Sequence, residues 1–156
     1  MFGEGLLGAA ATTFFMAMVP VIELRGALPV GVAAGLPVWA ATVIAIIGNM
    51  VPIPFILLLL RRIFAWLRSV PRLGAFIDKL EYRAHLKGRT VKKYRTLGLI
   101  ILVAIPLPGT GAWTGALGAS FLNMGIKSTT AAVCLGVILA GCIMGLASMG
   151  VIGFLG

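Results

Sequence analysis

The stretch Val19-Pro20-Val21-Ile22-Glu23-Leu24-Arg25-Gly26-Ala27-Leu28-Pro29 places a carboxylate, a guanidinium and two prolines inside an otherwise apolar N-terminal third. Charged side chains in an apolar segment are costly, and they usually face the protein interior or a water-filled cavity. Pro20 and Pro29 mark positions where a helix breaks or kinks. We therefore interpret this stretch as the tip of a broken, re-entrant membrane hairpin that carries a binding site.

The composition is that of an integral membrane protein. Of 156 residues, 60% are hydrophobic and 11% charged, and the mean hydropathy is +1.10. A soluble domain of this length could not cover its surface with so few charges, and apolar runs of about 18 or more residues indicate membrane-spanning helices. Cys134 and Cys142 lie about two helical turns apart, too far for a disulfide, so both are expected to pack. We expect no metal site and no cofactor.

The basic residues are concentrated in one segment, residues 61–95, which holds eleven of the thirteen in the chain and only two acidic residues. They are Arg61, Arg62, Arg68, Arg72, Lys79, Arg83, Lys87, Arg89, Lys92, Lys93 and Arg95. The positive-inside rule predicts that this segment is cytoplasmic. Because it lies between hydrophobic segments, we expect anionic lipid headgroups of the bilayer as its partners and no nucleic acid.

The N-terminal half, residues 3–60, contains two short apolar runs, 5–19 and the run that ends at Gly35, separated by the break at Pro20. A turn at Leu36-Pro37 and a spanning helix over 38–60 follow. Pro52 and Pro54 are expected to kink this helix, and Arg61-Arg62 to end it.

The segment between the halves has apolar residues at steps of three and four, which predicts a basic amphipathic helix over 61–87, bent or split at Pro71. It either lies in the headgroup layer or packs on the bundle as a solvated linker. Residues 87–95 are predicted to be a basic loop. His85, the single histidine, lies in this segment between the halves and not at membrane depth, and we expect no catalytic or proton-relay role for it.

The C-terminal half, residues 96–156, repeats the plan. The apolar run 97–105 stops at Pro106-Leu107-Pro108-Gly109-Thr110-Gly111, a short run 112–122 follows, and a long apolar helix covers 128–155. In that helix Ala132, Gly136 and Ala140, and likewise Gly141 and Gly145, recur at four-residue spacing, which lets helices approach closely.

Aligning Gly26-Ala27 with Gly111-Ala112 superposes the two breaks. If each broken pair enters and leaves the membrane on one side, the halves are inverted and both termini lie outside. The predicted fold is one all-α integral membrane domain, residues 1–156, with an inverted repeat of a re-entrant helical hairpin plus a transmembrane helix. Such repeats are typical of transporters, with the site where the breaks meet near the midplane. The alternative is a multi-span bundle whose short runs are complete spans.

The strings over residues 21–29 and 105–117 resemble signatures of the bacterial and archaeal small multi-drug export proteins, over essentially the whole chain. That family is distantly similar to the DedA/VTT superfamily. The kinship implies re-entrant hairpins and transport or flipping of a phospholipid or polyprenyl phosphate coupled to an ion gradient. The arginine-bearing motif of DedA near the second hairpin is not visible here, so residue roles carry over only to Glu23 and, more loosely, Arg25.

Glu23 and Arg25 are the charged members of the predicted site. On a regular helix two residues that are two positions apart do not pair, but near the Pro20 break both could face one cavity. They form either a buried ion pair that fixes the hairpin tip, or a divided site in which Arg25 binds phosphate oxygens and Glu23 takes up and releases a proton. The full set of candidate residues is Glu23, Arg25, Gly26, Pro29, Asn49, Pro106, Pro108, Gly109, Thr110, Gly111 and Trp113.

The uncharged candidates have plainer interpretations beside the functional ones. Thr110 could cap the helix after the second break, and Gly109 and Gly111 let the backbone approach a ligand. The prolines and glycines could instead only shape the hairpin. Trp113 could simply pack, and Asn49 could link helices or line the path. Two positive helix ends together with Arg25 favour an anionic substrate.

Three functions remain open at this point: a lipid-phosphate transporter or flippase, a proton-coupled exporter of cationic compounds, and a non-transporting membrane scaffold. An enzyme is not expected, because the sequence shows no nucleophile–base set. The glycine-rich helices suggest a homodimer.

Overall fold

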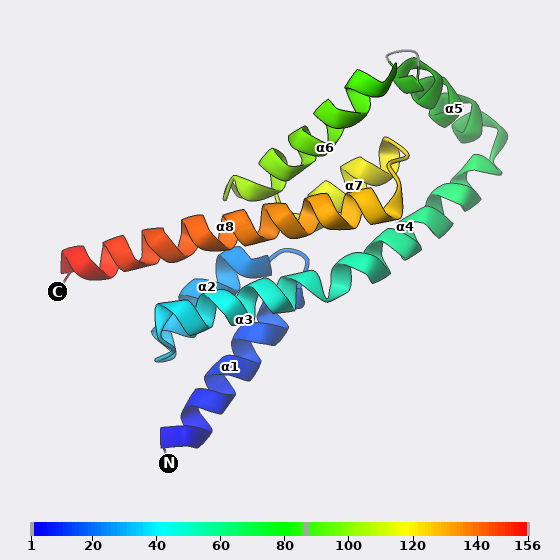
Figure 1. Cartoon of the computed structure of the whole chain (residues 1–156). Helices are drawn as coiled ribbons and strands as arrows, with labels where there is room; N and C mark the ends of the chain where they lie inside the picture. The colour runs from blue at the N-terminus through cyan, green and yellow to red at the C-terminus, as the bar shows by residue number, and fades with distance from the viewer. Residues whose placement is uncertain (1, 86–87, 156) are drawn as a thin grey trace.

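The computed structural model describes residues 2–85 and 88–155, and the side chains within them except those of residues 2–4, 77, 80, 81, 83–85, 88–92, 152 and 155. The described residues form eight helices and no strand, which confirms the predicted all-α class (Figure 1). The helices are α1 (Phe2–Met18), α2 (Glu23–Ala33), α3 (Val38–Met50), α4 (Pro52–Arg68), α5 (Pro71–His85), α6 (Gly88–Ala104), α7 (Ala112–Phe121) and α8 (Ile126–Leu155). The predicted role of His85 concerns a side chain outside the described residues.

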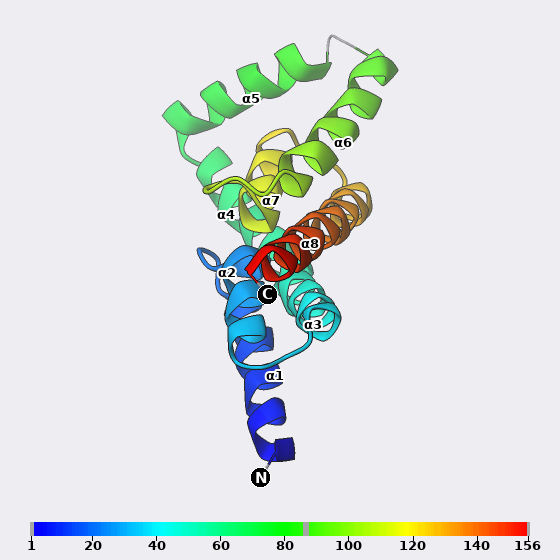
Figure 2. The same cartoon turned by 90° about the vertical axis from the view of Figure 1, so that its left-hand side faces the viewer.

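Two helical segments are long and apolar enough to cross a membrane, Val38–Arg68 and Ile126–Val151. The first consists of α3 and α4, which continue one another through Val51, a residue that keeps helical backbone angles. Pro52 and Pro54 cannot donate a backbone hydrogen bond, so the predicted kink lies at this junction. In Figures 1 and 2 the α3–α4 rod and α8 run past each other through the middle of the molecule.

The ends of two helices differ from the prediction. The spanning helix does not end at Arg61-Arg62, because α4 continues to Arg68, and the predicted loop over 87–95 is helical from Gly88 onward. Arginine and lysine are good helix formers, so a pair of charges does not stop a helix. The helix ends instead at the turn before Pro71, because proline cannot continue a preceding helix. As predicted, Pro71 splits the basic segment.

The two short helices, α2 and α7, end in the same backbone motif. After α2, the Gly35 N–H donates to Val32 O and the Leu36 N–H to Gly31 O. After α7, the N–H groups of Asn123 and Met124 make the corresponding bonds to Ser120 and Ala119. Both are Schellman caps with a residue of positive φ, Gly35 at 96° and Asn123 at 49°. Counted back from these caps, Glu23 corresponds to Gly111, whereas the sequence alignment paired Gly26 with Gly111.

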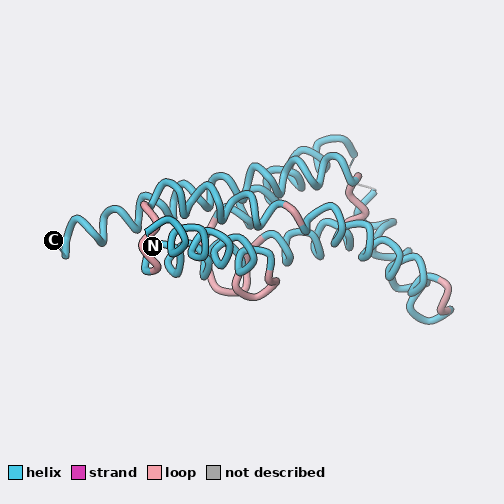
Figure 3. Tube along the Cα trace, turned by 90° about the horizontal axis from the view of Figure 1, so that it is seen from below, coloured by secondary structure: helices cyan, strands magenta, loops and turns pink. Residues whose placement is uncertain are grey.

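The described residues form three clusters of buried side chains, two mainly in the first half and one mainly in the second, and the smallest consists of Ala9, Leu36 and Ala41. In the first half Ala17, Leu24, Leu28 and Ala45 pack together with Ala140 of α8. The cluster of the second half draws on α4, α6, α7 and α8. Thus α3 packs with α1 and α2, while its continuation α4 packs against α7. Both termini lie toward the end of the molecule opposite α5 (Figure 3).

Several glycines mark the places where a neighbouring helix comes so close that no side chain fits. A Cβ on Gly136 of α8 would overlap Val103 of α6, and one on Gly141 would overlap Ile46 of α3. Gly48 of α3 meets the backbone carbonyl of Phe14 in α1 in the same way. The small residues predicted to allow close approach in the last helix therefore face α6 and α3, as expected for membrane helices that pack through small residues.

Replacing Gly136 with leucine is expected to lower the free energy of unfolding by about 1–3 kcal/mol or more, because the new side chain must displace Val103. Gly150→Leu is the matched control, since no atom lies within 4 Å of a Cβ at that position of the same helix. Unfolding of both variants in mixed micelles measures the effect. Equal stability of the two variants would contradict the packing of α6 on α8.

Candidate functional site

Glu23 and Arg25 pair with each other at the start of α2. Arg25 Nη1 lies 3.0 Å from Glu23 Oε2, and the exposed fractions of the two side chains are 17% and 6%. A regular helix would hold these residues on opposite sides, but Glu23 has a φ of 49°, which turns the chain out of the helical path just before α2 proceeds. Such a backbone angle is uncommon for a residue with a side chain. The pairing therefore depends on the break after Pro20.

Arg25 also holds the C-terminal end of α6. Its guanidinium donates to the carbonyls of Val103, Ile105 and Thr110, with Nη2 at 3.3 Å from Val103 O and 2.8 Å from Ile105 O. Pro106 and Pro108 lack the N–H groups that would continue α6, and the Leu107 N–H turns back to Ile105 O. The last carbonyls of α6 are thus available to a side chain, and a cation is favoured at this end of a helix.

Glu23 holds the N-terminal end of α7. The backbone N–H of Trp113 donates to Glu23 Oε1 at 3.1 Å, and a carboxylate is favoured at the positive end of a helix. Thr110 does not cap α7, contrary to the prediction. Its hydroxyl instead donates to the carbonyls of Ile105 and Leu107, at 3.0 and 2.9 Å. The hydroxyl is drawn into the turn because the prolines leave these carbonyls without helical partners.

Gly111 permits the close approach of the two breaks. A Cβ at this position would overlap Glu23 Oε2 and lie 2.7 Å from Glu23 Cδ, and it would also meet the Arg25 guanidinium. Only hydrogen fits between the α7 end and the ion pair. From the sequence, Gly111 is interpreted as leaving room for a ligand. In the structure it is instead the point where the second break contacts the charged first break.

The ion pair borders two spaces. The first, a hollow of about 620 Å³ called the break hollow, is lined by Pro20 to Gly26 except Leu24, by Pro108 to Thr110, and by Thr114. The second, called the closed space because it has no room for a water molecule, is bordered by Glu23 and Arg25 together with Asn49 and with Val137 and Ala140 of α8. Arg25 Nε and Asn49 Oδ1, which both border this closed space, are buried without a hydrogen-bond partner.

The predicted site residues separate into groups in the structure. Glu23, Arg25, Thr110, Gly111 and the Trp113 N–H meet directly, as described above. Gly26, Pro108 and Gly109 line the break hollow, and Asn49 lines the closed space. Neither space is lined by Pro29, which lies inside α2 without ending it, or by Pro106. The Trp113 side chain packs against the core cluster of the second half.

Sequence reasoning missed the backbone carbonyls of Val103 and Ile105, which accept hydrogen bonds from Arg25. It also missed Thr114, which lines the break hollow and donates to Gly109 O at 3.0 Å. A signal for the carbonyls was present, because two prolines in succession at the end of an apolar run leave carbonyls without intrahelical donors.

Gly111→Ala is expected to lower the free energy of unfolding by about 1–3 kcal/mol, because its methyl group would overlap the Glu23 carboxylate. Gly118→Ala, within α7 and without an atom in 4 Å of its Cβ, should be neutral or slightly stabilising. Unfolding in mixed micelles compares the two. If Gly111→Ala is as stable as Gly118→Ala, the two breaks do not meet as described.

A family model described as small multi-drug export protein matches residues 23–143. No curated protein and no solved structure matches the chain. The matched range begins at Glu23, directly after the first break, and includes the second break, the basic segment and most of α8. Together with the two apolar helices that are long enough to span a membrane, the match confirms the resemblance stated from the sequence: the chain belongs to the small multi-drug export protein family of membrane proteins.

Proposed function

We propose that this membrane export protein moves an anionic lipid phosphate, and that the Glu23–Arg25 pair is the closed gate of its path. The observation that carries the proposal is that the pair borders both the break hollow and the closed space, with each charge on the end of a different helix. An ion pair whose partners also bind helix ends can be released by a change of charge on either member.

The break hollow suits an anionic group. It is lined by the residues that directly precede α2 and α7, so the positive ends of both helices border it. Of the two charged side chains, that of Arg25 is the more exposed, at 17% against 6% for Glu23. A guanidinium presents a planar set of N–H donors that matches phosphate oxygens. A phosphate that enters the hollow would compete with Glu23 for this guanidinium.

Glu23 is the group that would couple transport to protons. Protonation would remove the charge that pairs with Arg25 and that caps α7. Arg25 Nε and Asn49 Oδ1 already lack partners in the closed arrangement, and each unpaired buried group costs about 1–3 kcal/mol. An open arrangement that admits water to the closed space would satisfy both. This cost favours a second arrangement in which both groups have partners.

The short helices support re-entrant hairpins within this proposal. At 1.5 Å per residue, α2 with 11 residues and α7 with 10 are about 15–17 Å long, which is about half the thickness of the hydrocarbon core. Both end in a Schellman cap followed by a long helix, and the two breaks meet at Gly111. We propose that residues 3–60 and 96–156 are inverted repeats, with the basic segment cytoplasmic and both termini outside.

A second candidate function is proton-coupled export of cationic compounds, as the family description suggests. The observation that favours it is the burial of Glu23, which is 5% exposed. A carboxylate released from Arg25 would attract a cation. The two candidates differ in which charge of the pair binds the substrate.

In proteoliposomes with a fluorescent polyprenyl phosphate, Arg25→Ala is expected to slow flipping at least about tenfold. The reason is that the loss of one hydrogen bond to a charged group costs about 1.5 kcal/mol or more, which corresponds to about a factor of ten. Arg25→Lys should slow it less, because it keeps the charge but loses the planar donors. Glu23→Gln should remove the dependence of flipping on the proton gradient. Arg72→Ala, an exposed arginine of α5, is the control.

The outcomes separate the functions. Unchanged flipping by Arg25→Ala would reject the anion site. Proton flux stimulated by a cationic compound and lost in Glu23→Gln would favour the second candidate. If both substitutions lower only the stability of the protein, the scaffold function is correct.

The topology has its own test. The test uses a variant that lacks Cys134 and Cys142. In that variant, Arg72→Cys should react with a membrane-impermeant thiol reagent only after the cells are permeabilised. Cysteine at Phe154, which is exposed near the end of α8, should react in intact cells. Labelling of position 72 in intact cells would reject the inverted arrangement.

A further inference from the structure

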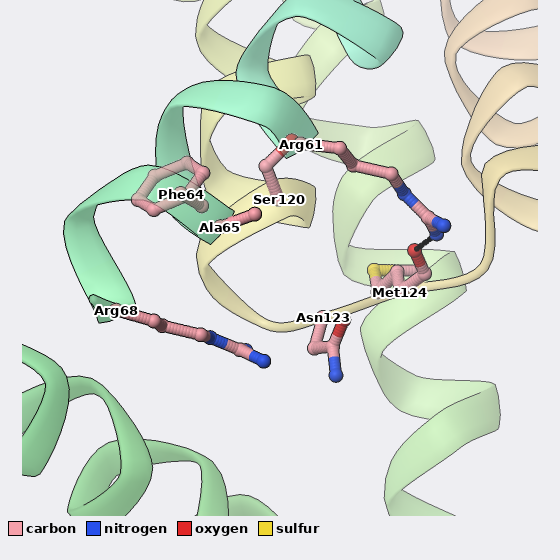
Figure 4. A pocket seen from close by; sticks show the side chains of 7 residues that line it. All are labelled: Arg61, Phe64, Ala65, Arg68, Ser120, Asn123 and Met124. Atoms are coloured by element: carbon pink, nitrogen blue, oxygen red, sulfur yellow. Dashed lines mark hydrogen bonds between the residues drawn. The ribbon is translucent and has the colours of Figure 1, made fainter.

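A second hollow with basic walls lies far along the chain from the Glu23–Arg25 pair, where α4 meets the end of α7. This arginine hollow, of about 320 Å³, is lined on its polar side by Arg61, Arg68, Ser120 and Asn123, and on its apolar side mainly by Phe64 and Met124. Figure 4 shows both arginine side chains extending from α4 toward the loop that carries Asn123 and Met124. Among the side chains that the structure describes, no acidic one lines it.

The walls of the arginine hollow are held in place by named contacts. Arg61 Nη2 donates to Met124 O at 3.0 Å, a bond drawn in Figure 4, and Arg95 Nη1 donates to Leu122 O at 3.4 Å. The Schellman cap fixes Asn123 between these two carbonyls. Phe64 meets Phe121 edge to face with a centroid distance of 4.8 Å. The loop is thus bound to α4 by a cation on one side and by aromatic rings on the other.

The two arginines of α4 can act on one ligand. Residues 61 and 68 are seven positions apart, about two turns, so they lie on the same face of the helix. The hydrogen bond to Met124 uses one of the five N–H donors of Arg61. The guanidinium groups of Arg61 and Arg68 each present several N–H donors, a chemistry suited to a phosphate group.

An apolar groove adjoins the arginine hollow and shares Arg61 and Ala65 with it. This groove, of about 660 Å³, is also lined by Leu58, Leu59, Arg62 and Ile126. Leu58 and Leu59 are 54% and 59% exposed. Arg61 therefore stands at the boundary between a polar space and an apolar one. A ligand that fills both must carry an anionic head and a hydrocarbon chain.

We infer that this surface binds an anionic phospholipid, with its phosphate in the arginine hollow and an acyl chain in the apolar groove. The lipid would join α4 to the turn between α7 and α8. It is a separate site from the break hollow, and its occupancy does not depend on whether the chain exports a lipid phosphate. Free phosphate shares the head chemistry but leaves the apolar groove empty, so the adjoining groove favours the lipid.

The test measures binding of short-chain dioctanoyl phosphatidylglycerol to the full chain in detergent, by native mass spectrometry and by the shift of the thermal midpoint that a ligand of the folded state produces. Inorganic phosphate and dioctanoyl phosphatidylcholine are the comparison ligands. We expect the anionic lipid to bind at least about tenfold more tightly than either, since only it offers both a net negative charge and a chain.

Variants assign the binding to the two spaces. Arg61→Ala and Arg68→Ala should each weaken the anionic lipid about tenfold or more, whereas Arg72→Ala, which removes the same charge from a position outside the hollow, should leave binding within about twofold. Arg61→Lys, which keeps the charge, provides a second variant if Arg61→Ala fails to fold. Leu58→Ala should weaken the lipid and leave phosphate binding unchanged.

Three results would overturn the inference. Equal weakening by Arg72→Ala and Arg68→Ala would mean that the lipid is attracted only by the general positive charge of the basic segment. Phosphate that binds as tightly as the lipid would mean that the apolar groove is not used. Weakening of the lipid by Arg25→Ala but not by Arg68→Ala would assign it to the break hollow.

Discussion

The whole structure depends on the placement of two opposite charges on two opposite helix ends. Glu23 accepts a hydrogen bond from the first turn of α7, Arg25 donates to the last carbonyls of α6, and the two side chains pair at 3.0 Å. Each charge meets the end of the helix dipole that favours it. The pair thus satisfies backbone groups that the ends of α6 and α7 would otherwise leave without partners.

This arrangement explains why the two breaks differ in composition. The first hairpin bears both charges and a backbone with positive φ at Glu23. The second has none of the charges, and it contributes two prolines that expose carbonyls and a glycine at the contact point. A second set of charges at this place would have to be desolvated as well, at a cost of several kcal/mol for each ion. The charged side chains of the first break bind the free backbone groups of the second, so the second break needs no charges of its own.

The long helices α3, α4 and α8 surround the contact between the two breaks. The α3–α4 rod packs first with α1 and α2 and then with α7, and α8 packs with α6 and then with α3. The pair therefore lies where the two larger core clusters approach α8, next to Val137 and Ala140. The packing of α4 against α7 also brings the end of α7 beside Arg61. There Arg61 and Arg95 donate hydrogen bonds to the carbonyls of the turn that follows α7. Basic residues thus bind the carbonyls at the C-terminal ends of both α6 and α7.

The sequence by itself determined the class of protein, the order of long and short helices, both breaks, the kink at Pro52 and the small-residue face of α8. These follow from local properties: apolar run length, proline geometry and the space that glycine leaves. Helix ends were less well predicted at Arg61 and at residues 87–95, because charge alone does not end a helix.

Only the tertiary structure decided how the charges are used. Two-residue spacing argues against an ion pair, and the pair forms because the backbone turns at Glu23 and because α6 and α7 present complementary ends. The partners of Arg25 are largely backbone carbonyls, which carry no side-chain signature in a sequence. The arginine hollow likewise requires α4 to lie beside the end of α7, a contact between segments some sixty residues apart in the chain. Long-range contacts of this kind depend on the packing of whole helices, which residue types at fixed spacing do not specify.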